Sequence, residues 1–334
     1  MTPQAGLRSR EPWRPPAPEG DGPEVVLLGE ALVAFLAADA LPLRDATTFR
    51  RTVVGSELNV ASGLARLGHD VLFCGRTGTD ALGEVVLDAV RGRGVRPALV
   101  TDPAPTGILV RDVSASRPVQ VDYARAGSAG SRLTVQDLPH GALAGTRVLH
   151  LSGITASLST SAHEACAAAV EQVRQHGGIV SFDPNLRRRL MDATWSRSTM
   201  LPLVARSTIL LAGLDELAWL SGLDEPAVGA AWALDQGVEL VVVKDGARGA
   251  WARDRVDGWS VPARPVTAVD PVGAGDAFAA GLLSALLRDA DLAQALTEAA
   301  AVAALVVGTP GDVEGLPDRA LLERVLAGGD EVHR

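Results

Sequence analysis

The chain has 334 residues, 47% of them hydrophobic and 21% charged, which suits one large α/β domain or two smaller ones. Its formal net charge of −9 argues against a nucleic-acid partner, because a phosphate backbone needs clustered lysine and arginine. No apolar run reaches the roughly 18 residues of a membrane span, and residues 1–22 lack the hydrophobic core of a signal peptide. We expect a disordered tail over 1–22, a cytoplasmic protein and no membrane partner.

Short apolar strands alternate with helices along the first part of the chain. The first predicted strand, Glu24–Gly29, contains the run Val25-Val26-Leu27-Leu28, which suits burial on both faces. A helix is predicted at Ser56–Leu67, a strand at Asp70–Cys74 and a helix at Ala81–Arg91. The hydrophobic period changes from two to about 3.6 at each switch, the pattern of βαβ units and a mostly parallel sheet.

The same alternation continues to the C-terminus. Further buried strands are predicted at Arg147–Leu151, Gly178–Phe182, Thr208–Leu211 and Glu239–Val243. Helices are predicted at 161–176, 195–205, 214–221 and 226–236, and then at Ala274–Arg288, Leu292–Val306 and Pro317–Leu326.

Two segments, Leu32–Val54 and Thr106–Tyr123, break this rhythm. The second contains two alternating strands, Thr106–Val113 and Val119–Tyr123, with no helix between them. Strands connected in this way cannot join a parallel sheet by the usual crossover. We therefore predict a small projecting β-sheet, a lid built from about 31–54 and 106–125.

A glycine-rich turn opens the predicted helix at Ala274. Gly273 and Gly275 allow close backbone approach to a ligand, and the first N–H groups of a helix can bind an anion. Asp276 lies in that first turn, where an acidic residue serves either chemistry or simple helix capping.

Three segments resemble the signatures of the ribokinase-like (phosphofructokinase-B type) carbohydrate kinases. Asp270–Gly281 resembles the C-terminal signature, Val54–Gly68 the N-terminal one, and Val243–Gly249 the nucleotide-side loop between them. The resemblance runs from Glu24 to about Leu326. It implies one kinase domain over 23–330, a Rossmann-like αβα sandwich with a β lid, and a homo-oligomer, a dimer through the lid.

The resemblance also implies residue roles for phosphoryl transfer from ATP. Asp276 would be the general base, and the N–H groups of Gly273, Ala274 and Gly275 would stabilise charge on the transferred phosphoryl group. Gly55 and Asn59 would meet the sugar. The residues implied for ATP binding are Lys244, Gly246, Gly249, Gly273 and Gly275.

A Mg²⁺ site is also implied. The family has an Asn-x-x-Glu motif that holds Mg²⁺ through water, and Gly213 and Glu216 occupy the matching positions, so the asparagine is missing. Glu216 remains the expected metal residue, because Mg²⁺ keeps most of its waters. The alternative is a surface carboxylate on a helix.

Four segments resemble 2-keto-3-deoxygluconate kinases within this family. They are Val121–Ser131, His150–Thr155, Phe182–Arg187 and the pair Pro271-Val272. The implied substrate is a sugar acid, most like 2-keto-3-deoxygluconate, phosphorylated to its 6-phosphate.

A sugar-acid substrate would account for four further residues. Arg125 and Arg187 could pair with it in a bidentate, charge-assisted way, and Tyr123 could cover the substrate from the lid. Ala34 stands where fructokinases place an aspartate, and such an aspartate would repel a carboxylate.

Other functions stay open beside this one. A fructokinase or another neutral-sugar kinase of the same family is the first alternative. An oxidoreductase would need GxGxxG directly after the first strand, which Leu28-Gly29-Glu30-Ala31 does not supply. A non-catalytic nucleotide-binding regulator would fit the replacement at Gly213, but the intact Asp276 argues against it. The chain also lacks GxxxxGK[ST], so a P-loop kinase is not expected.

Overall fold

The structure, a computed structural model, describes residues 22–39, 41–113, 119–187 and 193–328. The tail predicted over 1–22 lies outside these ranges except for its last residue. None of the helices within them combines the length and the apolar character that a bilayer crossing requires.

A nine-stranded sheet forms the centre of the molecule, in the order β13-β12-β11-β10-β9-β8-β1-β4-β5. Its strands are β1 (Val25–Leu28), β4 (Val71–Gly78), β5 (Arg96–Asp102), β8 (Val148–Ser152), β9 (Ile179–Asp183), β10 (Ile209–Gly213), β11 (Leu240–Lys244), β12 (Ala250–Arg253) and β13 (Gly258–Val261). Every pairing from β5 to β11 is parallel, whereas β12 and β13 add an antiparallel hairpin at one edge. The prediction of a mostly parallel sheet is confirmed.

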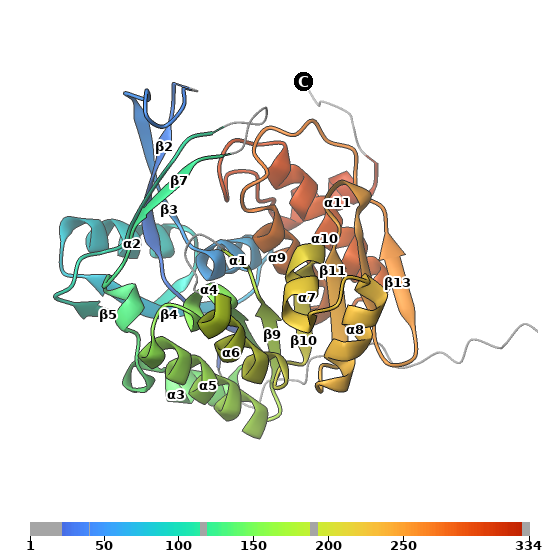
Figure 1. The fold of residues 1–334 in the computed structure, drawn as a ribbon. Helices are drawn as coiled ribbons and strands as arrows, with labels where there is room; N and C mark the ends of the chain where they lie inside the picture. The colour runs from blue at the N-terminus through green and yellow to red at the C-terminus, as the bar shows by residue number, and fades with distance from the viewer. Residues whose placement is uncertain (1–21, 40, 114–118, 188–192, 329–334) are drawn as a thin grey trace, which may run out of the picture.

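Helices cover both faces of this sheet, as Figure 1 shows. Successive side chains of a strand point to opposite faces, so Leu27 joins the core under one helical layer and Leu28 the core under the other. The first layer contains α1 (Ser56–Arg66), α2 (Ala81–Gly92), α9 (Ala274–Leu287) and α10 (Leu292–Val307). The second contains α3 (His140–Gly145), α5 (Thr160–Gln175), α6 (Ala193–Val204), α7 (Leu214–Ser221) and α8 (Pro226–Asp235).

Shorter helices complete the chain. The four-residue α4 (Gly153–Ala156) follows β8 directly, and α11 (Arg319–Leu326) packs on α10 through Leu322. Single 3₁₀ turns lie at Gly130–Arg132, Val135–Asp137 and Gly246–Arg248.

A separate four-stranded sheet projects from the main domain and forms the predicted lid (Figure 1). Its order is β3 (Phe49–Val54), β2 (Leu32–Ala37), β6 (Ile108–Arg111) and β7 (Val121–Ala124), with β2 and β6 parallel and the outer pairs antiparallel. Val33 and Phe35 join the core that α2 covers. The opposite face of the lid looks onto a pocket in the main domain.

The order of the central strands determines where that pocket lies. β1 is flanked by β4 on one side and β8 on the other, so the chain reverses its direction of winding there. Ligands of open α/β sheets bind at the carboxyl ends of strands near such a reversal. The residues at these ends that reach the pocket or its walls are Glu30, Ser152, Asp183, Gly213 and Lys244.

Candidate active site

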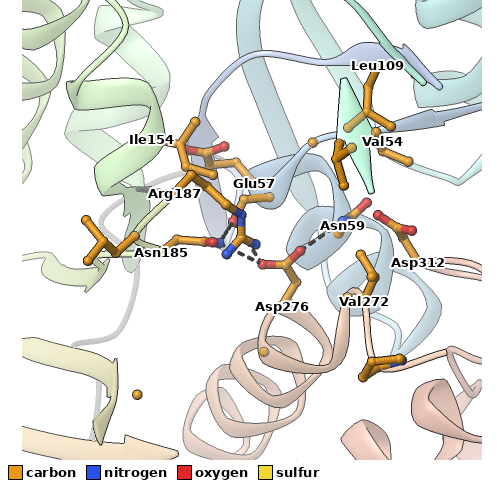
Figure 2. A pocket seen from close by; sticks show the side chains of 18 of the residues that line it. Val54, Glu57, Asn59, Leu109, Ile154, Asn185, Arg187, Val272, Asp276 and Asp312 are labelled. Carbon is orange, nitrogen blue, oxygen red and sulfur yellow. Dashed lines mark hydrogen bonds between the residues drawn. The ribbon is translucent and has the colours of Figure 1, made fainter. Parts of the chain in front are cut away.

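A cavity of about 830 Å³ lies between the lid and the carboxyl edge of the central sheet. Its walls come from the lid strands, the start of α1, the segment after β9, the start of α7, the loop after β11 and the turn before α9. This volume falls within the usual range for a small-molecule site. Figure 2 shows Asp276 at its floor, with side chains from distant parts of the sequence around it.

Three side chains donate hydrogen bonds to the Asp276 carboxylate. Asn59 Nδ2 donates to Oδ2 at 2.8 Å, Ser56 Oγ donates to Oδ1 at 2.9 Å, and Asn185 Nδ2 lies 3.3 Å from the same Oδ1. Asn185 also donates to Ser56 Oγ at 2.6 Å. In Figure 2, Asn59 and Asn185 approach Asp276 from two sides. The network therefore fixes the direction in which the carboxylate points.

Burial raises the pKa of Asp276 to about 7. The hydrogen bonds from Asn59 and Ser56 and the charge of Arg187 oppose this rise, while the charge of Asp183 adds to it. A carboxyl group with a pKa near neutrality can take up and release a proton at physiological pH, as a general base must.

The turn before α9 is built around Gly273. This residue caps α9 in the left-handed conformation, with φ 83°, and a Cβ there would lie 2.4 Å from the carbonyl oxygen of Asp312. Only glycine fits both conditions. Gly273 and Gly275 line the cavity, at the positive end of the α9 dipole. The N–H of Ala274 was expected to be free to bind the phosphoryl group. In the structure it donates to the Pro271 carbonyl oxygen at 3.3 Å.

Gly55 and Asn59, predicted to meet the sugar, both line the cavity. A Cβ at Gly55 would lie 2.4 Å from the carbonyl oxygen of Glu30, so the close approach of these two chain segments requires glycine. Asn59 is buried, and its Oδ1 has no hydrogen-bond partner among the described residues. A buried acceptor without a donor is costly, so a ligand hydroxyl that reached it would be stabilised.

Arg187 is exposed at the cavity, and Figure 2 shows its side chain pointing toward Asp276. Its charge lowers the pKa of Asp276. Arg188 and Arg189, which follow it, lie outside the described residues.

Arg125 has a partner that sequence reasoning missed. Its Nε and Nη2 donate to Oε2 of the buried Glu30 at 2.8 and 2.5 Å, and Ser128 Oγ donates to the other oxygen at 2.5 Å. The guanidinium also lies 5.8 Å from the centre of the Tyr123 ring, which itself lines the cavity. Arg125 is thus an arginine already paired within the wall. The argument from Ala34 overlooked this carboxylate, since Ala34 is buried in β2 whereas Glu30 lines the cavity.

Glu57 and Asn185 are further wall residues that were not assigned a role in advance. Glu57 Oε1 accepts hydrogen bonds from Ser152 Oγ and Thr155 Oγ1, both at 2.6 Å, and burial raises the pKa of Glu57. This contact ties the start of α1 to the end of β8. Asn185 adopts φ 41°, a left-handed conformation that asparagine tolerates better than most residues.

Not all of the residues expected to bind ATP lie in the cavity wall. Lys244 lines the cavity and donates to Asp183 Oδ2 at 2.5 Å. Burial lowers the pKa of Lys244, but the charges of Asp183 and Glu216 raise it overall, so the ammonium stays charged. Gly246 lines the cavity, whereas Gly249 does not. Gly249 instead serves the turn into β12, with φ 110° and a Cβ position 2.0 Å from the Val261 carbonyl oxygen.

Glu216 caps the start of α7. Its Oε2 accepts from the Gly213 N–H at 2.6 Å and its Oε1 from the Leu186 N–H at 2.9 Å. It also lines the cavity, so both oxygens keep lone pairs that could accept from metal-bound water. Within the described ranges no group of three or more histidine, cysteine, aspartate or glutamate residues could hold a metal directly.

Comparisons with known proteins agree on one family. The pfkB family carbohydrate kinase profile matches residues 23–319. A 2-dehydro-3-deoxygluconokinase of Bacillus subtilis (strain 168) is 33% identical over 316 residues, covering 93% of this chain and 98% of its own. A fructokinase of Klebsiella pneumoniae is 34% identical over 283 residues, covering 81% and 91%. A putative ribokinase II from E. coli, solved in complex with ATP and Mg²⁺, superposes with a TM-score of 0.85 at 25% identity, covering 92% of this chain and 99% of its own.

Proposed function

Because the chain belongs to the pfkB family of carbohydrate kinases, and is therefore a sugar kinase, we propose that its substrate is a sugar acid. The proposed reaction transfers the γ-phosphoryl group of ATP to 2-keto-3-deoxygluconate and forms the 6-phosphate. The B. subtilis relative that is similar over nearly the whole chain carries a name for this activity, since 2-dehydro-3-deoxygluconate is the same compound.

The observation that carries the substrate proposal is that Arg187 and Asp276 line the same cavity, with Arg187 exposed in it. A sugar acid presents a carboxylate at one end and a terminal hydroxyl at the other. Arg187 places an exposed, charged guanidinium group in the cavity, and the Asp276 carboxylate can accept the hydroxyl proton. A charge-assisted pair with a carboxylate is directional as well as strong, so it can orient the hydroxyl toward the base.

In the proposed reaction the substrate hydroxyl gives its proton to Asp276 while its oxygen forms a bond to the γ-phosphorus. The bond from that phosphorus to the β,γ-bridging oxygen breaks, and ADP leaves. The turn at Gly273 and Gly275 would stabilise the charge on the three equatorial oxygens. Asn59, held against Asp276, would accept from a sugar hydroxyl through its unpaired Oδ1.

ATP would occupy the part of the cavity lined by Lys244, Gly246 and the turn before α9. We propose Glu216 as the protein group nearest to a bound Mg²⁺, through water. The ion would supply positive charge to the β- and γ-phosphates. Support comes from the E. coli structure, whose printed description includes both ATP and Mg²⁺.

A neutral-sugar kinase is the second candidate, and one observation favours it. Glu30 is a carboxylate on the sugar side of the cavity, and carboxylates accept hydrogen bonds from sugar hydroxyls. Its oxygens already accept from Arg125 and Ser128, so little of this capacity is free.

The lid-mediated dimer also remains a proposal. Phe49 of β3 and Leu41 of the β2–β3 connection are exposed large apolar side chains that such a contact could cover. Light scattering on Phe49→Ser against wild type would test it.

A coupled ADP-release assay of the wild-type protein tests the substrate proposal. Sugar acids and neutral sugars are offered separately at equal concentrations. We expect 2-keto-3-deoxygluconate to give the highest kcat/KM; a higher value for fructose would replace the proposal by its alternative.

A further inference from the structure

Arg111, at the end of lid strand β6, extends out of the lid into the main domain. It is only 2% exposed, and its Nη2 donates to Asp270 Oδ2 and Asp312 Oδ1, each at 2.8 Å. Its Nη1 lies 3.3 Å from the Asp112 carbonyl oxygen. One guanidinium nitrogen therefore bridges two carboxylates from two separate segments.

The first of these carboxylates shapes the turn that precedes α9. Asp270 Oδ1 accepts from the Val272 N–H and Oδ2 from the Gly311 N–H, each at 3.2 Å. Val272 immediately precedes Gly273, the cap of α9. The Asp270 side chain, 0% exposed, thus holds the turn that we assign to the transferred phosphoryl group.

The second carboxylate belongs to the loop between α10 and α11, residues 308–318. The Asp312 carbonyl oxygen packs so closely on Gly273 that a Cβ there would lie 2.4 Å away. A second lid strand reaches the same loop, because Arg50 Nη1 of β3 pairs with Glu314 Oε1 at 2.6 Å on the surface. Two strands of the lid are therefore bound to the loop that supports the cap of α9.

Arg111 also lines the cavity, so a role in binding an anionic substrate has to be considered. Its charge is already opposed by two aspartates, which gives the three groups a formal net charge of −1 when both aspartates are ionised. A cluster with that balance does not attract an anion. Moving the guanidinium to a ligand would leave two buried carboxylates unpaired, which is costly.

We propose that Arg111 is a positioning residue that couples the lid to the phosphate-binding turn. With β6 seated, Arg111 fixes Asp270, and Asp270 fixes the turn at Val272 and Gly273. Buried ion pairs add little net stability compared with apolar packing, but they can specify one geometry, and a lateral error of about 1 Å in a reacting group can cost about 10²-fold in rate. The assignment rests on the proposed function only in taking this turn as the phosphoryl site.

Kinetics of three variants test this role. Arg111→Met keeps the length and apolar stem of the side chain but removes the bridge, and Arg111→Lys restores the charge on a shorter stem. Arg96→Met is the matched control, because it breaks an exposed arginine–aspartate pair, with Asp70, that involves neither the lid nor the loop 308–318. We expect kcat to fall about 10- to 100-fold in Arg111→Met, with KM for ATP within about threefold, and to recover in part in Arg111→Lys. The control should stay within about twofold of wild type.

Each result of these kinetics either supports or overturns the coupling. A folded Arg111→Met variant with kcat within about threefold of wild type, or with KM for ATP raised and kcat unchanged, overturns the coupling. If Arg111→Met does not unfold cooperatively, Arg111→Gln, which removes the charge but keeps a polar side chain, is judged by the same criteria. The ratio of variant to wild type is measured on whichever sugar wild type phosphorylates, so a wrong substrate assignment shows in wild type and a wrong role for Arg111 shows in the ratio.

Discussion

Asn59 Nδ2 donates a 2.8 Å hydrogen bond to Asp276 Oδ2, although 217 positions separate the two residues in the sequence. This bond joins the N-terminal turn of α1 to that of α9, helices that pack side by side against the same face of the central sheet. The sugar-facing helix and the helix of the proposed base therefore form one unit.

Replacing Asp276 by asparagine should remove the base while keeping its shape. Asp276→Asn is expected to lower kcat by about 10²- to 10⁴-fold, the usual contribution of a general base. The measurement is steady-state turnover, with ATP binding followed by calorimetry to show that the site is intact. Turnover within a few-fold of wild type would reduce Asp276 to a helix cap.

The same variant should be more stable than wild type at alkaline pH. Burial raises the pKa of Asp276 to about 7 in the folded protein, above the value near 3.8 expected when unfolded. The folded state then holds the extra proton between about pH 4 and 7, and above pH 7 a buried charge destabilises it. The gain in Tm of Asp276→Asn over wild type should therefore be larger at pH 8 than at pH 5. An equal gain at both pH values would contradict the raised pKa.

The pH dependence of kcat/KM should show an acidic limb near pH 7. The base is active when ionised, so activity is complete above its pKa of about 7 and falls about tenfold per pH unit below it. ATP itself titrates near this range, with a last phosphate pKa of about 6. The residual activity of Asp276→Asn is therefore the control, and its profile should lack the limb. A wild-type profile that is flat from pH 5.5 to 8 would exclude Asp276 as the titrating base.

Arg125 should matter to the stability of the fold, because it is the cation that pairs with the buried Glu30. Arg125→Ala leaves the carboxylate of Glu30, a residue that is 3% exposed, without its cation, and uncompensated buried charges cost about 3–5 kcal/mol. Urea unfolding should show this loss, and the double variant Arg125→Ala/Glu30→Gln should recover much of it. Arg132→Ala is the control, since its 3.5 Å pair with Asp102 involves an exposed arginine and is worth less than about 1 kcal/mol. Equal stability of Arg125→Ala and wild type would show that the pair is not formed in solution.

The alternation of apolar runs and helices predicted the central sheet and most helices to within a few residues, because burial on both faces leaves a clear pattern. The strands at the two edges of the central sheet were not predicted. β5 carries polar, exposed residues such as Arg96 and Thr101, and the hairpin of β12 and β13 is half exposed, so neither shows a continuous apolar run.

For the site, Asp276, Gly273 and Asn59 each stand in a recognisable motif, and the structure places all three in the wall of one cavity. The hydrogen-bond partners of a side chain could not be predicted in this way. Glu30 meets Arg125 across 95 positions, and Glu57 meets Ser152 across the same separation. Such contacts depend on how strand ends converge, which no local pattern records. The quoted segments around Glu57 and Asn185 could have indicated that these residues lie near the site, but not what they bind.

Arg187 gives the most direct test of the sugar-acid assignment. Removing it should cost about 10- to 100-fold in kcat/KM for 2-keto-3-deoxygluconate, because charge-assisted bonds to a carboxylate contribute about 1.5–3 kcal/mol. Arg187 also lowers the pKa of Asp276, so the assay is run at pH 8.5, where the base is ionised with or without it. Arg206→Ala, which removes a surface arginine paired with Glu171, is the matched control.

The decisive quantity is the ratio of kcat/KM for 2-keto-3-deoxygluconate to kcat/KM for fructose, measured in wild type, Arg187→Ala and Arg206→Ala. We predict a ratio well above one in wild type and in the control, and a fall of about tenfold or more in Arg187→Ala. A wild-type ratio below one, or an equal loss on both sugars in Arg187→Ala, would contradict the assignment of a sugar acid as the substrate.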